Sequence, residues 1–396
     1  MRKFISVVII ILVCVQIVLD MVAYNQMEAE ESSVYKYHLW LVILTLPLLL
    51  IDDIIHTKRL NNKSLRVYFY FILSVFSIVL LQEVLYSSSL LSTNRMFFIH
   101  VAYLFLFLVF IYNIGAGTVL KVSFLNTTAF ILWIVFVIVF IMGWRDLNVA
   151  LNMDARGMNN IYYVLMAFPF CQQNNNKKIR IITLVITGIL CLFSLKRGAI
   201  LAYLISTFFI AILSSGSTLN KKKIAAFLLS VSLLTTGYIL IDKYSGGYIT
   251  YRFQMEDSRD MGRNDIYGNV IKAQTGSSIG EYLFGHGPNS VRNTNEYGLT
   301  AHNDYMEILY DYGILPFLLW VLFIYTIVRF GYEKYKIGER RGAIILGSSC
   351  IFFVLSMVSQ VFFMSYTCVL FFYWGLAFNR KDNFAQDTNR FRKNHN

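Results

Sequence analysis

The chain has 396 residues, of which 57% are hydrophobic and only 15% are charged, and its mean hydropathy is +0.56. Soluble domains normally carry about a quarter of charged residues, so this composition excludes a chain of ordinary soluble domains. The formal net charge of +12 is explained by membrane topology, as argued below, so we expect no nucleic-acid partner.

Apolar runs that are long enough to cross a bilayer recur along the chain. They predict an all-α integral membrane protein with about twelve transmembrane helices, at 4–23, 38–55, 66–85, 97–114, 119–142, 160–173, 179–195, 198–213, 224–241, 313–330, 343–359 and 361–378. The runs at 160–173 and 198–213 are short, so we expect them to be tilted, broken or partly interfacial. The first run lacks a small-residue cleavage site and is expected to remain as a span.

Positive charges predict the orientation of these spans. If the N-terminus is cytoplasmic, 23 of the 35 Lys and Arg residues fall on the cytoplasmic side, as the positive-inside rule requires. Both termini are therefore expected in the cytoplasm. The predicted organisation is spans one to nine at 1–241, an extracytoplasmic loop at 242–312, spans ten to twelve at 313–378 and a cytoplasmic tail at 379–396.

Two outer segments carry cations against the charge rule. Lys196 and Arg197 stand in a short turn between two apolar runs, and the loop 242–312 contains Arg263 and Arg292 among its six Lys and Arg residues. Binding of an anionic substrate would explain these positions. The alternative is that long loops escape the rule and that Lys196 and Arg197 simply reach the lipid headgroups.

Residues 261–314 form a polar, glycine-rich segment in an otherwise apolar chain. Local patterns predict a helix at 261–273, a turn at Gly285-His286-Gly287-Pro288 and an amphipathic helix at 302–312. Gly313 is expected to end the second helix, and Pro316 suits the first turn of the next span. The apolar face of the second helix comprises Tyr305, Ile308 and Leu309, while Glu307 and Asp311 lie four residues apart on another face.

Three residues on the predicted outer side have side chains suited to chemistry on a phosphate. Arg197 and Arg263 could bind phosphate oxygens through paired hydrogen bonds. His302 could take a proton near neutral pH. Such a set would suit a lipid-linked phosphate donor and a hydroxyl acceptor. Taken singly, a loop histidine is more often a hydrogen-bonded surface residue, and a loop arginine is more often a solvated charge.

Several short motifs occur in a fixed order: Ser194-Leu195-Lys196-Arg197-Gly198-Ala199, Gly262-Arg263-Asn264-Asp265-Ile266-Tyr267, Leu283-Phe284-Gly285-His286-Gly287, and His302-Asn303-Asp304-Tyr305 with Leu309 and Gly313-Ile314. In this order they resemble the signature of the O-antigen ligase and polymerase superfamily. Arg156-Gly157 with Asn159-Asn160 resembles a further family element weakly. The chain departs from the family pattern at Lys196, where a small residue is usual, and at Pro316, where a second glycine is common.

The resemblance implies a fold, an activity and roles for the three residues. The fold would be a glycosyltransferase C-like bundle with short helices in its large extracytoplasmic loop. The activity would be glycosyl transfer at the outer face of a bacterial cytoplasmic membrane, from a glycan on undecaprenyl pyrophosphate. Arg197 and Arg263 would hold the pyrophosphate, and His302 would be the general base of an inverting reaction. The family chemistry implies no metal and no other cofactor.

Further residues are expected to bind substrate: Lys196, Asn303, Tyr305, Gly285, Gly287, Asn289 and Arg292. The turn at 285–289, with Asn303 and Tyr305, would shape the acceptor groove, and Asn303 would orient the imidazole. For these residues, helix capping or packing is the alternative interpretation.

Three functions remain open on the sequence. A polymerase of capsule, exopolysaccharide or O-antigen repeat units is favoured, because the chain is compact and has no added soluble domain. A ligase that transfers glycan to lipid A core or to protein is the alternative. A multi-pass transporter of an anionic or glycolipid substrate is a third function, of another class. The expected partners are lipid-linked oligosaccharide donor and acceptor, the bilayer, a chain-length regulator and a flippase.

Overall fold

The computed structural model describes residues 2–24, 33–56, 62–86, 91–116, 120, 122–149, 158–174, 176–194, 196–213, 231–232, 235–240, 242–243, 247, 250, 264–295, 298–362, 364 and 366–379. Most of the predicted span at 224–241, the first part of the long loop and nearly all of the predicted tail at 379–396 therefore lie outside the described residues.

Helices account for most of the described chain. The N-terminal part forms α1 (Arg2–Tyr24), α2 (Ser33–His56), α3 (Lys63–Tyr86), α4 (Leu91–Ala116), α5 (Val122–Val149), α6 (Ile161–Cys171), α7 (Lys177–Phe193) and α8 (Arg197–Leu213). The C-terminal part forms a helix over 264–275, then α11 (Ile279–Phe284), η1 (Ser290–Thr294), α12 (Asp304–Tyr312), α13 (Ile314–Lys336), α14 (Arg340–Val358) and α15 (Thr367–Asn379).

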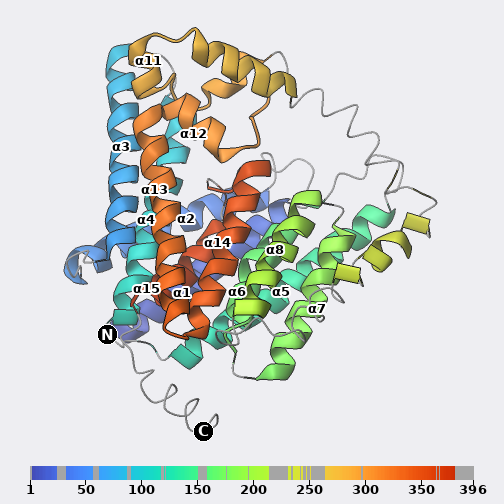
Figure 1. Cartoon of the computed structure of the whole chain (residues 1–396). Coiled ribbons are helices and arrows are strands. Elements are labelled where there is room, and N and C mark those ends of the chain that lie inside the picture. The colour runs from blue at the N-terminus through green and yellow to red at the C-terminus, as the bar shows by residue number, and fades with distance from the viewer. Residues whose placement is uncertain are drawn as a thin grey trace.

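The long helices pack into one bundle with the loop helices at one end. α3, α13, α14 and α8 follow one another across the bundle, and each packs against the next (Figure 1). On the other side, α4 packs against α2 and α15, and α5 packs against α1 and α6. α11 and α12 lie at the upper end in this view, beyond the end of α14 (Figure 1). The fold therefore places the polar segment on one end of an apolar bundle.

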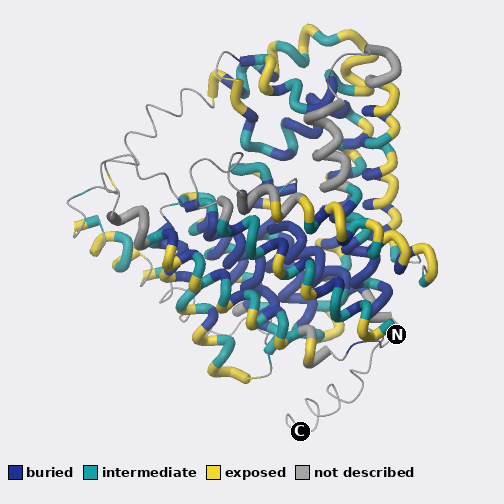
Figure 2. The backbone as a smooth tube through the Cα atoms, turned by 180° about the vertical axis from the view of Figure 1, so that it is seen from behind, coloured by how far each residue is buried: buried dark blue, intermediate teal, exposed yellow. Residues whose placement is uncertain are grey.

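Aromatic side chains fill the contact between α3, α13 and the last two helices. The ring centroid of Tyr68 lies 4.5 Å from that of Phe323, and Trp320 lies 4.5 Å from Phe362. These rings are fully or almost fully buried, and the buried backbone is concentrated in the middle of the bundle (Figure 2). Outward-facing apolar side chains such as Leu318, which is 56% exposed, suit contact with lipid rather than water.

The prediction of an α-helical membrane protein agrees with the structure. By length and composition, five described helices could cross a membrane: Arg2–Val22, Lys63–Leu81, Asn126–Trp144, Ile314–Lys336 and Arg340–Val358. Shorter apolar helices occur at Ala102–Ile114, Ile161–Cys171, Arg197–Ile210 and Thr367–Phe378. Every predicted span except 224–241 falls on a described helix. The count of twelve spans is not supported by these helices and stays a prediction.

One predicted span begins later than expected. The apolar run at 361–378 predicted a helix from its first residue, but α15 begins at Thr367. The backbone N–H groups of Val361 and Phe362 instead donate to the carboxylate of Asp304 in α12, at 3.0–3.1 Å. A distant carboxylate thus replaces the local helical bonds of these residues. The segment 359–366, between α14 and α15, is called the α14–α15 connection below.

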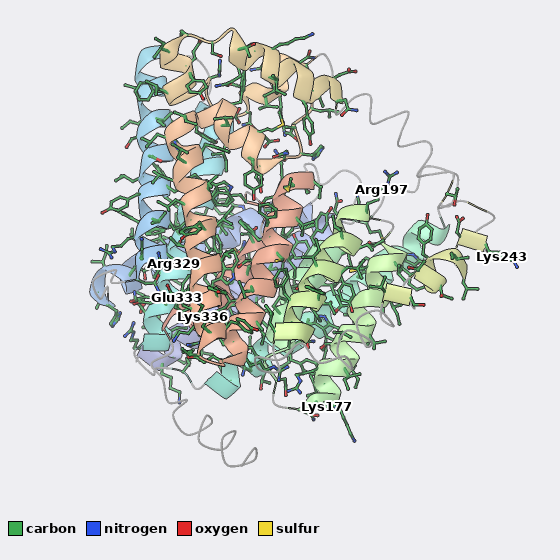
Figure 3. All side chains as sticks on the ribbon, in the orientation of Figure 1. Lys177, Arg197, Lys243, Arg329, Glu333 and Lys336 are labelled. Atoms are coloured by element: carbon green, nitrogen blue, oxygen red, sulfur yellow. The ribbon has the colours of Figure 1, made fainter. Side chains whose placement is uncertain are left out.

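Charged side chains mark the two ends of the bundle differently. Lys177 lies at the lower end of α7, and Arg329, Glu333 and Lys336 lie toward the lower end of α13 (Figure 3). Arg197 lies at the upper end of α8, the end at which α12 is found (Figures 1 and 3). The arginine of the short turn and the polar segment therefore share one end.

Candidate functional site

The turn that carries Arg197 is held by its serine. Ser194 is buried, its hydroxyl donates to the carbonyl of Cys191 at 2.7 Å, and its oxygen accepts from the N–H of Lys196 at 3.3 Å. The Lys196 carbonyl accepts the N–H of Ile200 at 3.1 Å, so α8 starts directly after it. Arg197 is exposed in the first turn of α8, and Lys196 is partly buried.

A glycine brings this turn against the end of α14. A Cβ atom on Gly198 would lie 2.5 Å from Cγ2 of Val358, the last residue of α14. Real Cβ contacts essentially never come this close, so only glycine allows the two helices to approach without a shift. The start of α8 is therefore packed directly on the end of α14.

A second element with the weaker family resemblance meets the same turn. The N–H of Met158 donates to the carbonyl of Ser194 at 3.1 Å. Asn159 and Asn160 follow directly and lead into α6, and Asn160 is buried. Arg156 and Gly157 lie outside the described residues.

His302 stands at the start of α12 in an unusual backbone conformation. Its φ is +50°, in the left-handed region that few non-glycine residues adopt, and the residue is partly buried. Asn303 is the N-cap of α12, because its side-chain oxygen accepts the N–H groups of Tyr305 at 3.0 Å and Met306 at 3.2 Å. The geometry thus gives Asn303 a capping role, and its proposed orientation of the imidazole stays a prediction.

The side chain of Tyr305 in α12 packs against α14. Its ring meets that of Phe353 edge-on, with centroids 5.9 Å apart. The hydroxyl is buried and has no hydrogen-bond partner among the described residues. Burial raises the pKa of Tyr305, and the nearby charge of Asp304 raises it further, so this side chain stays neutral. A neutral, unsatisfied hydroxyl on α12 is compatible with the predicted contact to substrate.

The glycine turn at 285–289 is built around the C-terminal end of α12. Gly285 has φ +76° and ψ 179°, which is almost confined to glycine, and a Cβ there would lie 2.2 Å from the carbonyl oxygen of Asp311. The N–H of Gly287 donates to that carbonyl at 3.0 Å, and the N–H of Asn289 donates to the Asp311 carboxylate at 2.9 Å. These contacts give the turn a packing role in addition to the predicted one.

Of the two remaining predicted arginines, the structure describes Arg292 and not Arg263. Arg292 is exposed in η1, and its charge lowers the pKa of Glu307, so the two groups are close enough to interact. Arg263 lies outside the described residues, which resume one position later with the helix over 264–275. Ile266 and Val270 of this helix pack with Val291, Ala301 and Tyr310 in a small separate core.

Three acidic residues of α12 are buried, which the sequence patterns did not predict. Asp304, Glu307 and Asp311 are each at most 5% exposed. Asp304 accepts two N–H groups of the α14–α15 connection, and Asp311 accepts those of Asn289 and Val291. Glu307 accepts the side-chain N–H of Gln360. The spacing of three and four residues places all three on one helical face. This spacing was the only sequence signal that the three acids could share one environment.

Burial changes the acidity of this face. Desolvation raises the pKa of Glu307 to about 7, although bonds from Gln360 and from the backbone of His302 and Ala301 act in the opposite direction. Desolvation, followed by the charge of Glu307, raises the pKa values of Asp304 and Asp311 well above their usual range. Both effects favour the protonated acids in the folded protein.

We therefore expect the folded protein to be more stable at pH 5.5 than at pH 8. A group whose pKa is raised on folding stabilises the fold fully below its unfolded pKa, and this contribution is lost as the pH rises through the folded pKa. For Glu307, a change from 4.5 to about 7 corresponds to on the order of 3 kcal/mol in all, of which about 2 kcal/mol is lost between pH 5.5 and pH 8. Thermal midpoints of the purified protein in detergent measure the effect.

The control for this prediction is an exposed acid. Glu307→Gln should reduce the difference in thermal midpoint between the two pH values. Glu333→Gln should leave it unchanged, because the Glu333 side chain is 57% exposed. Equal midpoints at pH 5.5 and pH 8 for the unaltered protein would contradict the prediction.

Two elements that carry predicted site residues pack on the C-terminal part of α14. Arg197 approaches it through α8, and His302, Asn303 and Tyr305 approach it through α12. Within the described residues, no three His, Cys, Asp or Glu side chains lie together as ligands for a metal ion. Basic, imidazole and hydroxyl groups at one end of an apolar bundle can bind an anion and accept a proton.

Residues 182–321 match the family model described as O-antigen ligase.

The matched O-antigen ligase segment is about a third of the chain and runs from α7 through α8 and the long loop into α13. It contains both Arg197 and His302, so the resemblance predicted from the ordered motifs is confirmed. The match supports glycosyl transfer of the O-antigen ligase and polymerase type in general, and the family implies a lipid-linked glycan and a membrane setting. No curated protein sequence matches the chain.

Proposed function

We propose that this protein is a polysaccharide polymerase that joins undecaprenyl-pyrophosphate-linked oligosaccharide repeat units. The reaction takes place at the outer face of a bacterial cytoplasmic membrane, and both chain termini lie in the cytoplasm. One observation carries the proposal: Arg197 and His302, about a hundred positions apart in sequence, lie at one end of the bundle on helices that both pack on the end of α14.

The start of α8 suits an anionic group for two reasons. Arg197 is an exposed guanidinium in the first turn of a 17-residue helix. The first N–H groups of a helix are unsatisfied and carry a partial positive charge, so they favour an anion at the same place. Arg197, with Arg263, would hold the pyrophosphate and stabilise the negative charge that grows on it.

The proposed reaction is a direct displacement at the donor sugar. The acceptor hydroxyl oxygen attacks the anomeric carbon, and the bond from that carbon to the phosphate oxygen breaks. The electron pair leaves with the lipid pyrophosphate, and the hydroxyl proton passes to His302. One displacement inverts the configuration at the anomeric carbon. Tyr305, with its unsatisfied hydroxyl, would contact the acceptor beside His302.

The charge distribution supports the proposed topology. Lys177 and Lys336 lie at the end of the bundle opposite to Arg197 (Figure 3). Cytoplasmic segments are usually the richer in Lys and Arg, so the end with Lys177 and Lys336 would face the cytoplasm. The proposal retains the twelve predicted spans, with α12 and η1 in the extracytoplasmic loop.

Purified protein supplied with lipid-linked repeat units tests the function. A ladder of products with increasing numbers of repeat units is expected from a polymerase. Transfer of a single preformed glycan to added lipid A core, without a ladder, would instead show a ligase. Neither product, with substrate moved across vesicles, would show the transporter.

We expect Arg197→Ala to lower turnover by about 10²–10³-fold, the usual cost of losing one preorganised charge donor. Arg197→Lys should recover only part of this loss, because an ammonium group cannot form paired bonds to phosphate. Initial rates of ladder formation measure both variants.

Lys177→Ala is the matched control, since Lys177 is an exposed cation near the start of α7, at the other end of the bundle. It should retain the full rate. Unchanged polymer yield and length in Arg197→Ala would remove Arg197 from the pyrophosphate site.

A further inference from the structure

Glu307 is buried directly behind the turn that carries His302. Its side chain is 4% exposed, and one carboxylate oxygen accepts the side-chain N–H of Gln360. Hydrogen bonds from the backbone of Ala301 and His302 also act on this carboxylate. Its own N–H donates to the carbonyl of Asn303 at 3.0 Å. Glu307 therefore contacts three successive residues: Ala301, His302 with its left-handed backbone, and Asn303.

Gln360 is fixed in turn by its neighbours in the α14–α15 connection. Its carbonyl accepts the hydroxyl of Tyr366 at 2.6 Å. The next two residues, Val361 and Phe362, donate their N–H groups to Asp304. The amide that meets Glu307 is thus part of a segment held at several points.

The same segment continues the helix against which α8 begins. Val358, the last residue of α14, lies against Gly198, directly after Arg197. Only one residue separates Val358 from Gln360. A short covalent and hydrogen-bonded path therefore runs from the start of α8 through Val358 and Gln360 to Glu307, and from there to the backbone of His302.

We propose that Glu307 is a positioning residue, which holds the His302 turn at a fixed place relative to Arg197 through its bonds to Gln360 and to the backbone at 301–302. This inference rests on the proposed function, because it assigns Glu307 to the geometry of that site. A catalytic base must lie within hydrogen-bond reach of its proton, and misplacement by about 1 Å can cost about 10²-fold in rate. A left-handed histidine needs such support from its surroundings.

An exchange of the two partners provides the test. In Gln360→Glu, a second carboxylate faces Glu307, and when both are ionised neither can donate a hydrogen bond to the other. We expect turnover to fall at least tenfold, with little change in KM for the lipid-linked substrate. In the double variant Glu307→Gln with Gln360→Glu, residue 307 can donate to residue 360 and still accept from the backbone. Most of the lost rate should return.

The charges around Glu307 allow a pH readout as well. Arg292 from η1 faces it, and Asp304, Asp311 and Tyr312 interact with it from its own helix. If the ionised carboxylate supports the His302 turn, turnover requires both Glu307 and His302 to be deprotonated. The rate of the unaltered protein should then fall with the second power of the proton concentration at low pH. In Glu307→Gln, the rate should fall with only the first power of the proton concentration. A merely structural residue would leave this slope unchanged.

A measurement without substrate separates this inference from the proposed function. Hydrogen exchange of backbone amides should become faster in Gln360→Glu at 299–303 and 359–362, while exchange at 341–350 in α14 stays slow. If the unaltered protein makes no polymer but exchange changes in this way, the proposed function fails and the positioning contact stands. Unchanged exchange, unchanged turnover, or no recovery in the double variant would each overturn the inference.

Discussion

His302→Asn is expected to lower turnover by about 10²–10⁴-fold, the usual contribution of a positioned general base. Asparagine tolerates left-handed backbone better than most residues, so it fits the φ of +50° found at this position. It keeps a polar side chain but cannot accept the acceptor proton near neutral pH. The variant therefore removes the proposed base while it keeps the turn.

Rates of ladder formation, together with thermal midpoints, measure this effect. The midpoint should stay within a few degrees of that of the unaltered protein. His302→Val is the contrasting variant, because a β-branched residue does not fit left-handed backbone and should lower the midpoint as well. Full turnover in His302→Asn would exclude His302 as the base.

Gly285→Ala is expected to destabilise the segment 264–312 by more than about 3 kcal/mol. Alanine rarely adopts φ +76° with ψ 179°, and its Cβ would lie 2.2 Å from the Asp311 carbonyl oxygen. The obstructing atoms belong to the backbone of α12, which no side-chain rotation can move. A Cβ on Gly313, where φ is +83°, would likewise lie 2.3 Å from the carbonyl oxygen of Leu283.

Protease sensitivity of the loop and hydrogen exchange at 304–312 measure the loss of structure in Gly285→Ala. Gly268→Ala is the matched control in the same loop, because a Cβ at Gly268 meets nothing within 4 Å and the residue lies within the helix over 264–275. That change should stabilise slightly, by about 0.5–1 kcal/mol, through helix propensity. Equal protection of the loop in both variants would contradict the expected clash.

The helical part of the fold follows from local patterns. Long apolar runs predict helices because a backbone within lipid must satisfy its own hydrogen bonds. α12 was predicted at 302–312 and is found at Asp304–Tyr312, with Gly313 as its C-cap and Pro316 in the first turn of α13. These features depend on residues a few positions apart, so the sequence shows them directly.

The hydrogen bonds that hold α12 in place join residues far apart in sequence, so they could not be predicted. Glu307 and Asp311 were assigned to a face separate from the apolar side chains of α12, yet both acids are buried, as is Ile308 on the apolar face. Asp304 finds its donors at Val361 and Phe362, and Glu307 finds Gln360, more than fifty positions away. A helical wheel shows that acids share a face but not what that face meets.

The spatial relation between Arg197 and His302 was predicted only in part. Charge counts and motif order placed both residues on the outer side. The structure adds that the end of α14 lies between their helices, through Val358 on one side and Phe353 on the other. Neither residue of α14 belongs to a motif, because apolar packing places few demands on residue identity.

The bonds from Val361 and Phe362 to Asp304 also have a consequence for protein engineering. A chimaera that exchanged only the segment up to Tyr312 would place the incoming residue 304 against an α14–α15 connection from the other protein, without the fit that now gives the Asp304 carboxylate its two backbone donors. An uncompensated buried acid costs several kcal/mol. To transfer the loop intact between relatives, the exchanged piece must therefore include 359–366 as well. The two segments to exchange, the loop up to Tyr312 and the connection 359–366, are separate in sequence, and α13 and α14 between them can remain those of the host protein.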